Sequence, residues 1–323
     1  MPLIERSSYI PPRFFSNGHL QTVYPTLFRR FTKNYYLRER INTPDDDFLD
    51  IDWALNNNNK LAVISHGLEG NTCRQYALGM VKQLLDNGID ALAWNYRGCS
   101  GEPNRQLRFY HNGVTDDLEV VIDHAERTGR YSEIYLIGFS MGGNLNLLYL
   151  GQKGENVPGM LKKAVVFSVP CDLESSSDQL EKFTNRLYLK RFLRMLHEKI
   201  TAKMKIMPGI LDDSDYSRIR NFRDFDDRYT APIHGFRDAV DYWEKTSSKK
   251  RLHNIRIPVL IISAKDDPFL PGECYPVEEA ENSNYLHLEM PEHGGHTGFI
   301  EFNRDNVYWS EKRAVEYLCG DSK

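Results

Sequence analysis

The sequence has few cysteines, no long apolar run and no strong excess of either charge, and each absence excludes a class of protein. Its five cysteines form no C-x-x-C pair, so neither a disulfide framework nor a zinc knuckle is expected. Apolar runs such as IPVLIIS at 257–263 have the length of a strand, far short of the ~20 residues that cross a membrane. The 41 basic and 45 acidic residues nearly balance, which provides no broad electrostatic surface for nucleic acid.

Targeting and nucleotide-binding signals are also missing. Residues 1–15 lack the apolar core of a secretory signal, so we expect a cytoplasmic protein with reduced thiols. Neither G-x-x-x-x-G-K-[ST] nor G-x-G-x-x-G occurs, and no nucleotide cofactor is predicted. With 41% hydrophobic residues, the chain of 323 residues is instead typical of one large globular domain.

Short apolar segments alternate along the chain with segments of helical periodicity. Buried strands are predicted at 61–65, 89–95, 134–139, 163–169 and 257–263, with helices near 75–87, at 115–127 and from 141 onward. After an irregular N-terminal stretch, this order predicts an α/β fold whose mostly parallel, doubly wound sheet is covered on both faces. Such folds bind ligands at the carboxyl ends of their strands.

A long interval separates the predicted strands at 163–169 and 257–263. Within it, five apolar residues follow helical spacing: Leu189, Phe192, Leu193, Leu196 and Ile200. This segment is either one amphipathic helix packed on the core or part of a cap over the active site. Because the interval leaves from the catalytic end of a strand, we favour a helical cap at about 172–250, inserted within a single domain of 1–323.

The strongest chemical signal is the segment 138–142, GFSMG, a G-x-S-x-G motif between a predicted strand and a predicted helix. In a nucleophile elbow the chain turns sharply and holds serine in a strained conformation, and flanking glycines keep side chains out of the turn. The motif therefore predicts Ser140 as a nucleophile. The structural alternative is a glycine-rich turn that only packs the helix on the sheet.

A serine hydrolase also needs backbone N–H donors for the oxyanion of its tetrahedral intermediate. Met141 opens the helix after the serine, so its N–H is one expected donor. The second should come from the loop after an earlier strand, where the sequence has HGLEG at 66–70. We expect Leu68 to supply that donor, with His66 and Gly67 as candidate pocket residues.

In this fold the acid and the histidine follow the serine in the chain. His296 lies in the glycine-rich loop HGGHTGF and is the predicted base, with His293 as the second choice. The acid should follow a strand, and AKDDPFLP offers Asp267, which we favour, and Asp266 as the alternative. The acid would orient the imidazole beside Ser140, and this mechanism requires no metal or organic cofactor.

Two alternatives to a serine mechanism remain open from the residues alone. His293 and His296, with Glu292, resemble a metal-ligand cluster, but zinc proteases place two histidines four apart on one helix rather than three apart in a loop. A non-catalytic ligand-binding protein could also keep this fold. The presence of all three triad residue types in the expected chain order disfavours that interpretation.

Eight longer segments carry a resemblance that extends over nearly the whole chain: FSNGHLQT (15–22), SHGLEGN (65–71), YRGCSGEPNR (96–105), YHNGVTDDL (110–118), GFSMGGN (138–144), FDDRYTAPIHGF (225–236), AKDDPFLP (264–271) and EHGGHTGFIE (292–301). In these segments the sequence resembles the YheT-like group of the α/β hydrolases, also called AB-hydrolase family 4. The resemblance implies nucleophile Ser140, acid Asp267 and base His296, and the compact form resembles bacterial members. It gives no chemical role to His19 or to the RGCSGEPN segment.

The resemblance also implies a substrate class. It points to hydrolysis of carboxylic esters, as in a short- to medium-chain carboxylesterase or a monoacylglycerol-type lipase, with phospholipids as substrates of some members. In some relatives of similar sequence, the same triad also transfers acyl groups to alcohols. We therefore expect a small ester or lipid as the partner of this protein, and neither nucleic acid nor an integral membrane segment.

Overall fold

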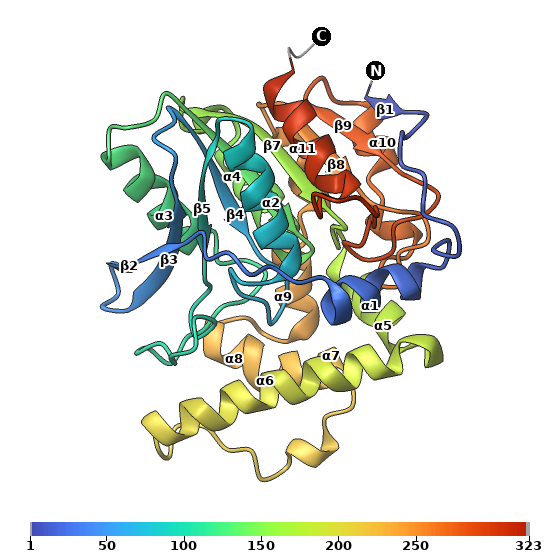
Figure 1. The fold of residues 1–323 in the computed structure, drawn as a ribbon. Coiled ribbons are helices and arrows are strands. Elements are labelled where there is room, and N and C mark those ends of the chain that lie inside the picture. The colour runs from blue at the N-terminus through green and yellow to red at the C-terminus, as the bar shows by residue number, and fades with distance from the viewer. Residues whose placement is uncertain (1, 321–323) are drawn as a thin grey trace.

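The computed structural model describes residues 2–320, and within them nine strands form one mixed sheet (Figure 1). In chain order the strands are β1 (Leu3–Ile4), β2 (Leu37–Asn42), β3 (Phe48–Ala54), β4 (Lys60–Ser65), β5 (Asp90–Trp94), β6 (Glu133–Phe139), β7 (Leu161–Phe167), β8 (Val259–Ile262) and β9 (Leu286–Glu289). Their order in the sheet is β1-β9-β8-β7-β6-β4-β5-β3-β2. The pairs β2–β3 and β3–β5 are antiparallel, and the other pairs are parallel.

Helices cover both faces of the sheet. They are α1 (Gly18–Phe28), α2 (Gln75–Asp86), α3 (Thr115–Arg127), α4 (Met141–Lys153), α5 (Leu173–Glu181), α6 (Arg186–Ile206), α7 (Phe222–Phe225), α8 (Ala231–His234), α9 (Ala239–Thr246), α10 (Val277–Glu281) and α11 (Trp309–Cys319). One apolar cluster joins the sheet to α3 and α4, and a second joins its opposite face to α2 and α11. Among the described residues, no helix combines the length and the apolar character needed to cross a membrane.

The central strands read as continuous apolar runs because both of their faces are buried. In β4, Leu61 and Val63 pack with α3 and α4, whereas Ala62 and Ile64 pack with α2 and α11. Successive side chains of a strand point to opposite faces, so each apolar residue finds a helix on its own side. The predicted mostly parallel, doubly wound α/β sheet is confirmed.

The prediction of an irregular N-terminal stretch is wrong, because this part of the chain contains α1, the edge strands β1 and β2, and strand β3. Charged side chains obscured the strands in the sequence. Arg38 and Arg40 of β2 pair with Asp52 and Asp50 of β3, at N–O distances of 2.8 and 2.7 Å. The buried carboxylates would be costly without a partner, and the arginines compensate this cost. The same ion pairs stabilise the pairing of the two strands, which therefore form without a long apolar run.

Between β7 and β8 the chain forms α5 to α9, and α6 lies across the end of the molecule below the sheet (Figure 1). The apolar stripe of α6 packs against Phe109, Phe225 and Tyr229. Two lysines fix α6 to the loop that follows β5: the ammonium of Lys199 donates to the carbonyl of Gly98 at 2.5 Å, and that of Lys203 to the carbonyl of Asn104 at 2.8 Å. The RGCSGEPN segment therefore anchors α6.

Candidate active site

Ser140 occupies a strained turn between β6 and α4. Its φ of 54° and ψ of −118° place a non-glycine residue at positive φ, as a nucleophile elbow requires. The flanking glycines are needed for close approach of the backbone. A Cβ on Gly142 would lie 2.3 Å from the carbonyl oxygen of Ser65, and one on Gly138 would lie 2.5 Å from that of Gly142.

His296 and Asp267 form a buried pair at the carboxyl end of the sheet. The Nδ1 atom of His296 lies 2.9 Å from Oδ2 and 3.1 Å from Oδ1 of Asp267. The Asp267 side chain has no exposed surface, and the His296 side chain is 11% exposed. The backbone N–H of Phe269 also donates to Asp267, at 2.9 Å. A histidine whose Nδ1–H donates to such a carboxylate has Nε2 as its acceptor nitrogen.

The alternative acid, Asp266, faces a different histidine. Its Oδ2 lies 3.3 Å from Nδ1 of His293, and its Oδ1 accepts the N–H of Gly295 at 2.8 Å. Burial raises the pKa of Asp266, although the bonds from Gly295 and His293 act in the opposite direction. The two neighbouring aspartates thus hold two histidines of one loop, and of these histidines it is His296 that lines the cavities at Ser140.

The turn after β4 lies beside the serine, and Leu68 lines both cavities that reach Ser140. Three other amides of this turn donate within the protein: Gly67 to the Tyr76 hydroxyl, Glu69 to the Tyr110 hydroxyl and Gly70 to the Gly67 carbonyl, each at 3.0 Å. Met141 is the first residue of α4 and lines the first cavity. Leu68 and Met141, the predicted oxyanion donors, thus both line a cavity that reaches Ser140.

His66 and Gly67, the candidate pocket residues, differ in position. Gly67 lines the second cavity. His66 is buried, with its Nδ1 2.8 Å from the carbonyl of Gly67 and its Nε2 accepting the N–H of Tyr96 at 3.3 Å. Burial lowers the pKa of His66 to about 3, so its ring is neutral and holds the turn in place.

Helix α1 positions the His296 loop, a role that the sequence did not reveal. The hydroxyl of Thr22 accepts the backbone N–H of His296 at 2.9 Å. Gly18 packs so closely on the turn after β8 that a Cβ there would lie 1.9 Å from the Asp266 carbonyl oxygen. His19 contacts the Tyr188 hydroxyl on α6 at 3.2 Å. The NGHLQT segment was a visible signal, but its partners lie more than 150 residues away in the sequence.

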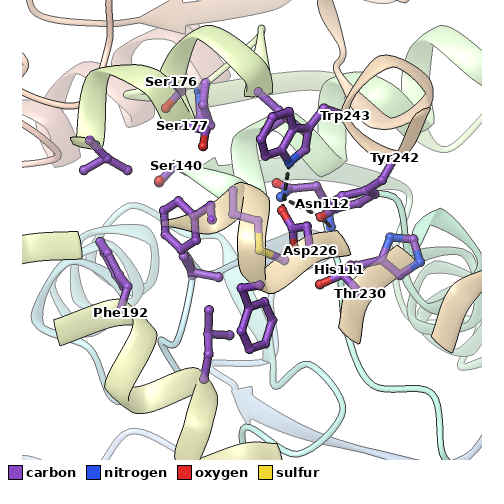
Figure 2. Close-up of a pocket in the computed structure, with 18 of the residues that line it drawn as sticks. His111, Asn112, Ser140, Ser176, Ser177, Phe192, Asp226, Thr230, Tyr242 and Trp243 are labelled. Carbon is purple, nitrogen blue, oxygen red and sulfur yellow. Dashed lines mark hydrogen bonds between the residues drawn. The ribbon is translucent and has the colours of Figure 1, made fainter. Parts of the chain in front are cut away.

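Two cavities meet at Ser140, with empty volumes of about 840 and 1160 Å³ including their open mouths. Both are lined by Leu68, Ser140, Phe192, Phe269 and His296. The first extends among α5, α6, α7 and α9 (Figure 2), and the second runs along α1 and α6. A ligand bound at Ser140 can therefore place one arm in each cavity.

The sheet order and the strained serine after a central parallel strand define an α/β hydrolase. Comparison with known proteins agrees. A family model described as "Serine aminopeptidase, S33" (Hydrolase_4) matches residues 56–275. The "Putative esterase YheT" of Escherichia coli is 38% identical over 97% of this chain and 93% of its own length. Phospholipase ABHD3 of Bos taurus is 32% identical, over 85% of this chain and 70% of its own length.

A solved structure gives the same fold. The esterase Pf2001 of Pyrococcus furiosus superposes with a TM-score of 0.59 over 90% of this chain and 96% of its own, at 17% sequence identity. The chain belongs to the Hydrolase_4 family of α/β hydrolases. The predicted resemblance to the YheT-like group is confirmed.

Proposed function

We propose that this ester hydrolase is a serine esterase in which Ser140 is the nucleophile, His296 the base and Asp267 the acid that orients it. The observation that carries the proposal is the buried Asp267–His296 hydrogen bond, at 2.9 Å, beside a serine held at positive φ. The family model is named for an aminopeptidase, whereas the relatives that match most of the chain are named as an esterase and a phospholipase. We therefore propose a small carboxylic ester or lipid ester as substrate.

Each step of the reaction then has a group to perform it. Nε2 of His296 takes the proton of Ser140 as Oγ attacks the ester carbonyl, and Asp267 stabilises the imidazolium that forms. The amides of Leu68 and Met141 stabilise the oxyanion. His296 next protonates the departing alcohol, which leaves the acyl group on Ser140. Water, deprotonated by His296, releases the acid and regenerates the enzyme.

The segment between β7 and β8 is proposed as the cap of this site, within a single domain of 1–323. Its helices supply Leu173, Phe192, Leu196, Phe225 and Trp243 to the first cavity. These side chains would exclude water from the bound ester, which strengthens electrostatic interactions in the site. The cap would span about 172–250, with α6 fixed by its two lysine anchors.

Asparagine substitutions at the two neighbouring aspartates test the proposal with matched controls. On p-nitrophenyl butanoate, Ser140→Ala and Asp267→Asn should each lower kcat by about 10³-fold or more, because the second leaves imidazole in the wrong tautomer. Asp266→Asn should cost less than about tenfold, since its amide oxygen can still accept the N–H of Gly295. Equal and mild losses in both aspartate variants would contradict the assignment of the acid.

A further inference from the structure

The first cavity contains a polar cluster that the proposed mechanism does not use. Asn112, Asp226, Thr230, Tyr242 and Trp243 all line it, and Figure 2 shows them gathered on one side of the cavity with Ser140 on the other. Apolar side chains form much of the remaining wall, among them Leu173, Leu180, Phe192, Leu196 and Phe222. An ester arm leaving Ser140 thus passes apolar surface and also meets a polar wall.

Hydrogen bonds fix the cluster, and among the described residues one buried acceptor in it has no donor. The indole N–H of Trp243 donates to Oδ2 of Asp226 at 2.8 Å. The backbone and side-chain N–H groups of Asn112 donate to the Tyr242 hydroxyl at 2.9 and 3.0 Å. Among residues 2–320, no group donates to the buried Oδ1 of Asn112. Since the Tyr242 oxygen already accepts two N–H groups, its own O–H is oriented to donate elsewhere.

Such an arrangement is costly in an apolar cavity unless a ligand completes it. A buried polar atom without a hydrogen bond loses the solvation that it would have in water. The carboxyl of Asp226 is buried as well, and burial raises its pKa to about 7 despite the bonds from Thr230 and Trp243. The cluster therefore offers acceptors on Asn112 and Asp226 and a donor on Tyr242, which matches a group that both donates and accepts.

We propose that the first cavity recognises an ester arm ending in a hydroxyl group, which donates its proton to Asn112 Oδ1 or the Asp226 carboxylate and accepts from the Tyr242 hydroxyl. A methyl end would leave both acceptors desolvated, and a carboxylate end would be repelled by Asp226 at pH 8, where this carboxyl is largely ionised. This inference rests on the proposed function, because it requires Ser140 to hold the ester at the entrance of the cavity. Either the acyl or the alcohol arm of the ester could carry the hydroxyl.

Ethyl alkanoates with methyl, hydroxyl or carboxylate ends, compared at equal chain length by titration of the released acid, test the acyl arm. Acetates of simple alcohols and monoacetates of the matching diols test the alcohol arm. In one of the two sets the wild type should prefer the hydroxyl end over the methyl end by about tenfold or more in kcat/KM. A preference for the methyl end at every length in both sets would overturn the inference.

Substitutions then test whether the cluster is responsible. Asp226→Asn and Asn112→Leu should each reduce the hydroxyl-to-methyl ratio of kcat/KM, and Asp226→Asn should in addition relieve the discrimination against a carboxylate end. An increase in kcat/KM for carboxylate-ended esters cannot arise from damage to the fold. Asp227→Asn is the matched control, because this neighbouring carboxylate is exposed, and its ratio should equal that of the wild type. A ratio unchanged in Asp226→Asn would overturn the inference.

The two proposals can fail separately. Hydrolysis of methyl-ended esters that depends on Ser140 but shows no hydroxyl preference would refute only the role of the polar cluster. Absence of any hydrolysis that depends on Ser140, in either ester set, would refute the serine mechanism as well.

Discussion

The buried carboxyl of Asp226 should make the stability of this protein depend on pH in a way that one substitution removes. Burial raises its folded pKa to about 7, from 3.8 for an unperturbed aspartate. A raised carboxyl pKa means that stability is lost as pH rises from about 4 towards 7, since the unfolded state ionises more readily. The resulting cost rises from about 2 kcal/mol at pH 5 to about 4 kcal/mol at pH 8.

Asp226→Asn removes this titration and keeps a carbonyl oxygen for the indole N–H of Trp243. We therefore compare the free energies of unfolding of the variant and the wild type. The advantage of the variant should be roughly 2–3 kcal/mol larger at pH 8 than at pH 5. Urea unfolding of both proteins at a series of pH values measures this difference, because all other titrating groups are shared. Asp227→Asn controls for the loss of one charge from the same turn. A difference between Asp226→Asn and the wild type that stays constant with pH would refute the reasoning.

Two further predictions concern the backbone around the site. Gly142→Ala should cost more than about 2 kcal/mol of stability and abolish activity, because its methyl group would lie 2.3 Å from a backbone oxygen. Thermal unfolding, with Gly159→Ala as the control at an open position, measures this, and a well-folded, active Gly142→Ala would contradict it. Thr22→Val leaves the His296 amide without its acceptor and should lower kcat about tenfold with little change in KM. Thr128→Val, far from the site, is the control, and a Thr22 variant as active as the wild type would show that α1 does not position the base.

Much of the core could be predicted because its signals are local. The apolar run of β6 and the glycines beside Ser140 lie within ten residues of one another, so strand, turn and helix followed from one segment. The carboxyl ends of parallel strands meet at one edge of the sheet, which is why Ser140, Asp267 and His296 could be associated without knowledge of their distances.

Other features depend on contacts between distant segments. In the sequence, strand β2 looks like a charged surface segment. Its arginines, Arg38 and Arg40, find their carboxylate partners only when β3 lies beside it. The sequence offered Asp266 and Asp267 as neighbouring acids, and only the conformation of the turn directs one to each histidine. The polar cluster was equally hidden, because Asn112 and Asp226 come from segments more than a hundred residues apart.

The central claim is that Ser140 is an activated nucleophile, and a fluorophosphonate probe tests it most directly. Intact mass measurement should show one probe per wild-type chain and none on Ser140→Ala, with strongly slowed labelling of Asp267→Asn and near-normal labelling of Asp266→Asn. Labelling that persists in Ser140→Ala, or a folded wild type that remains unlabelled, would contradict the account.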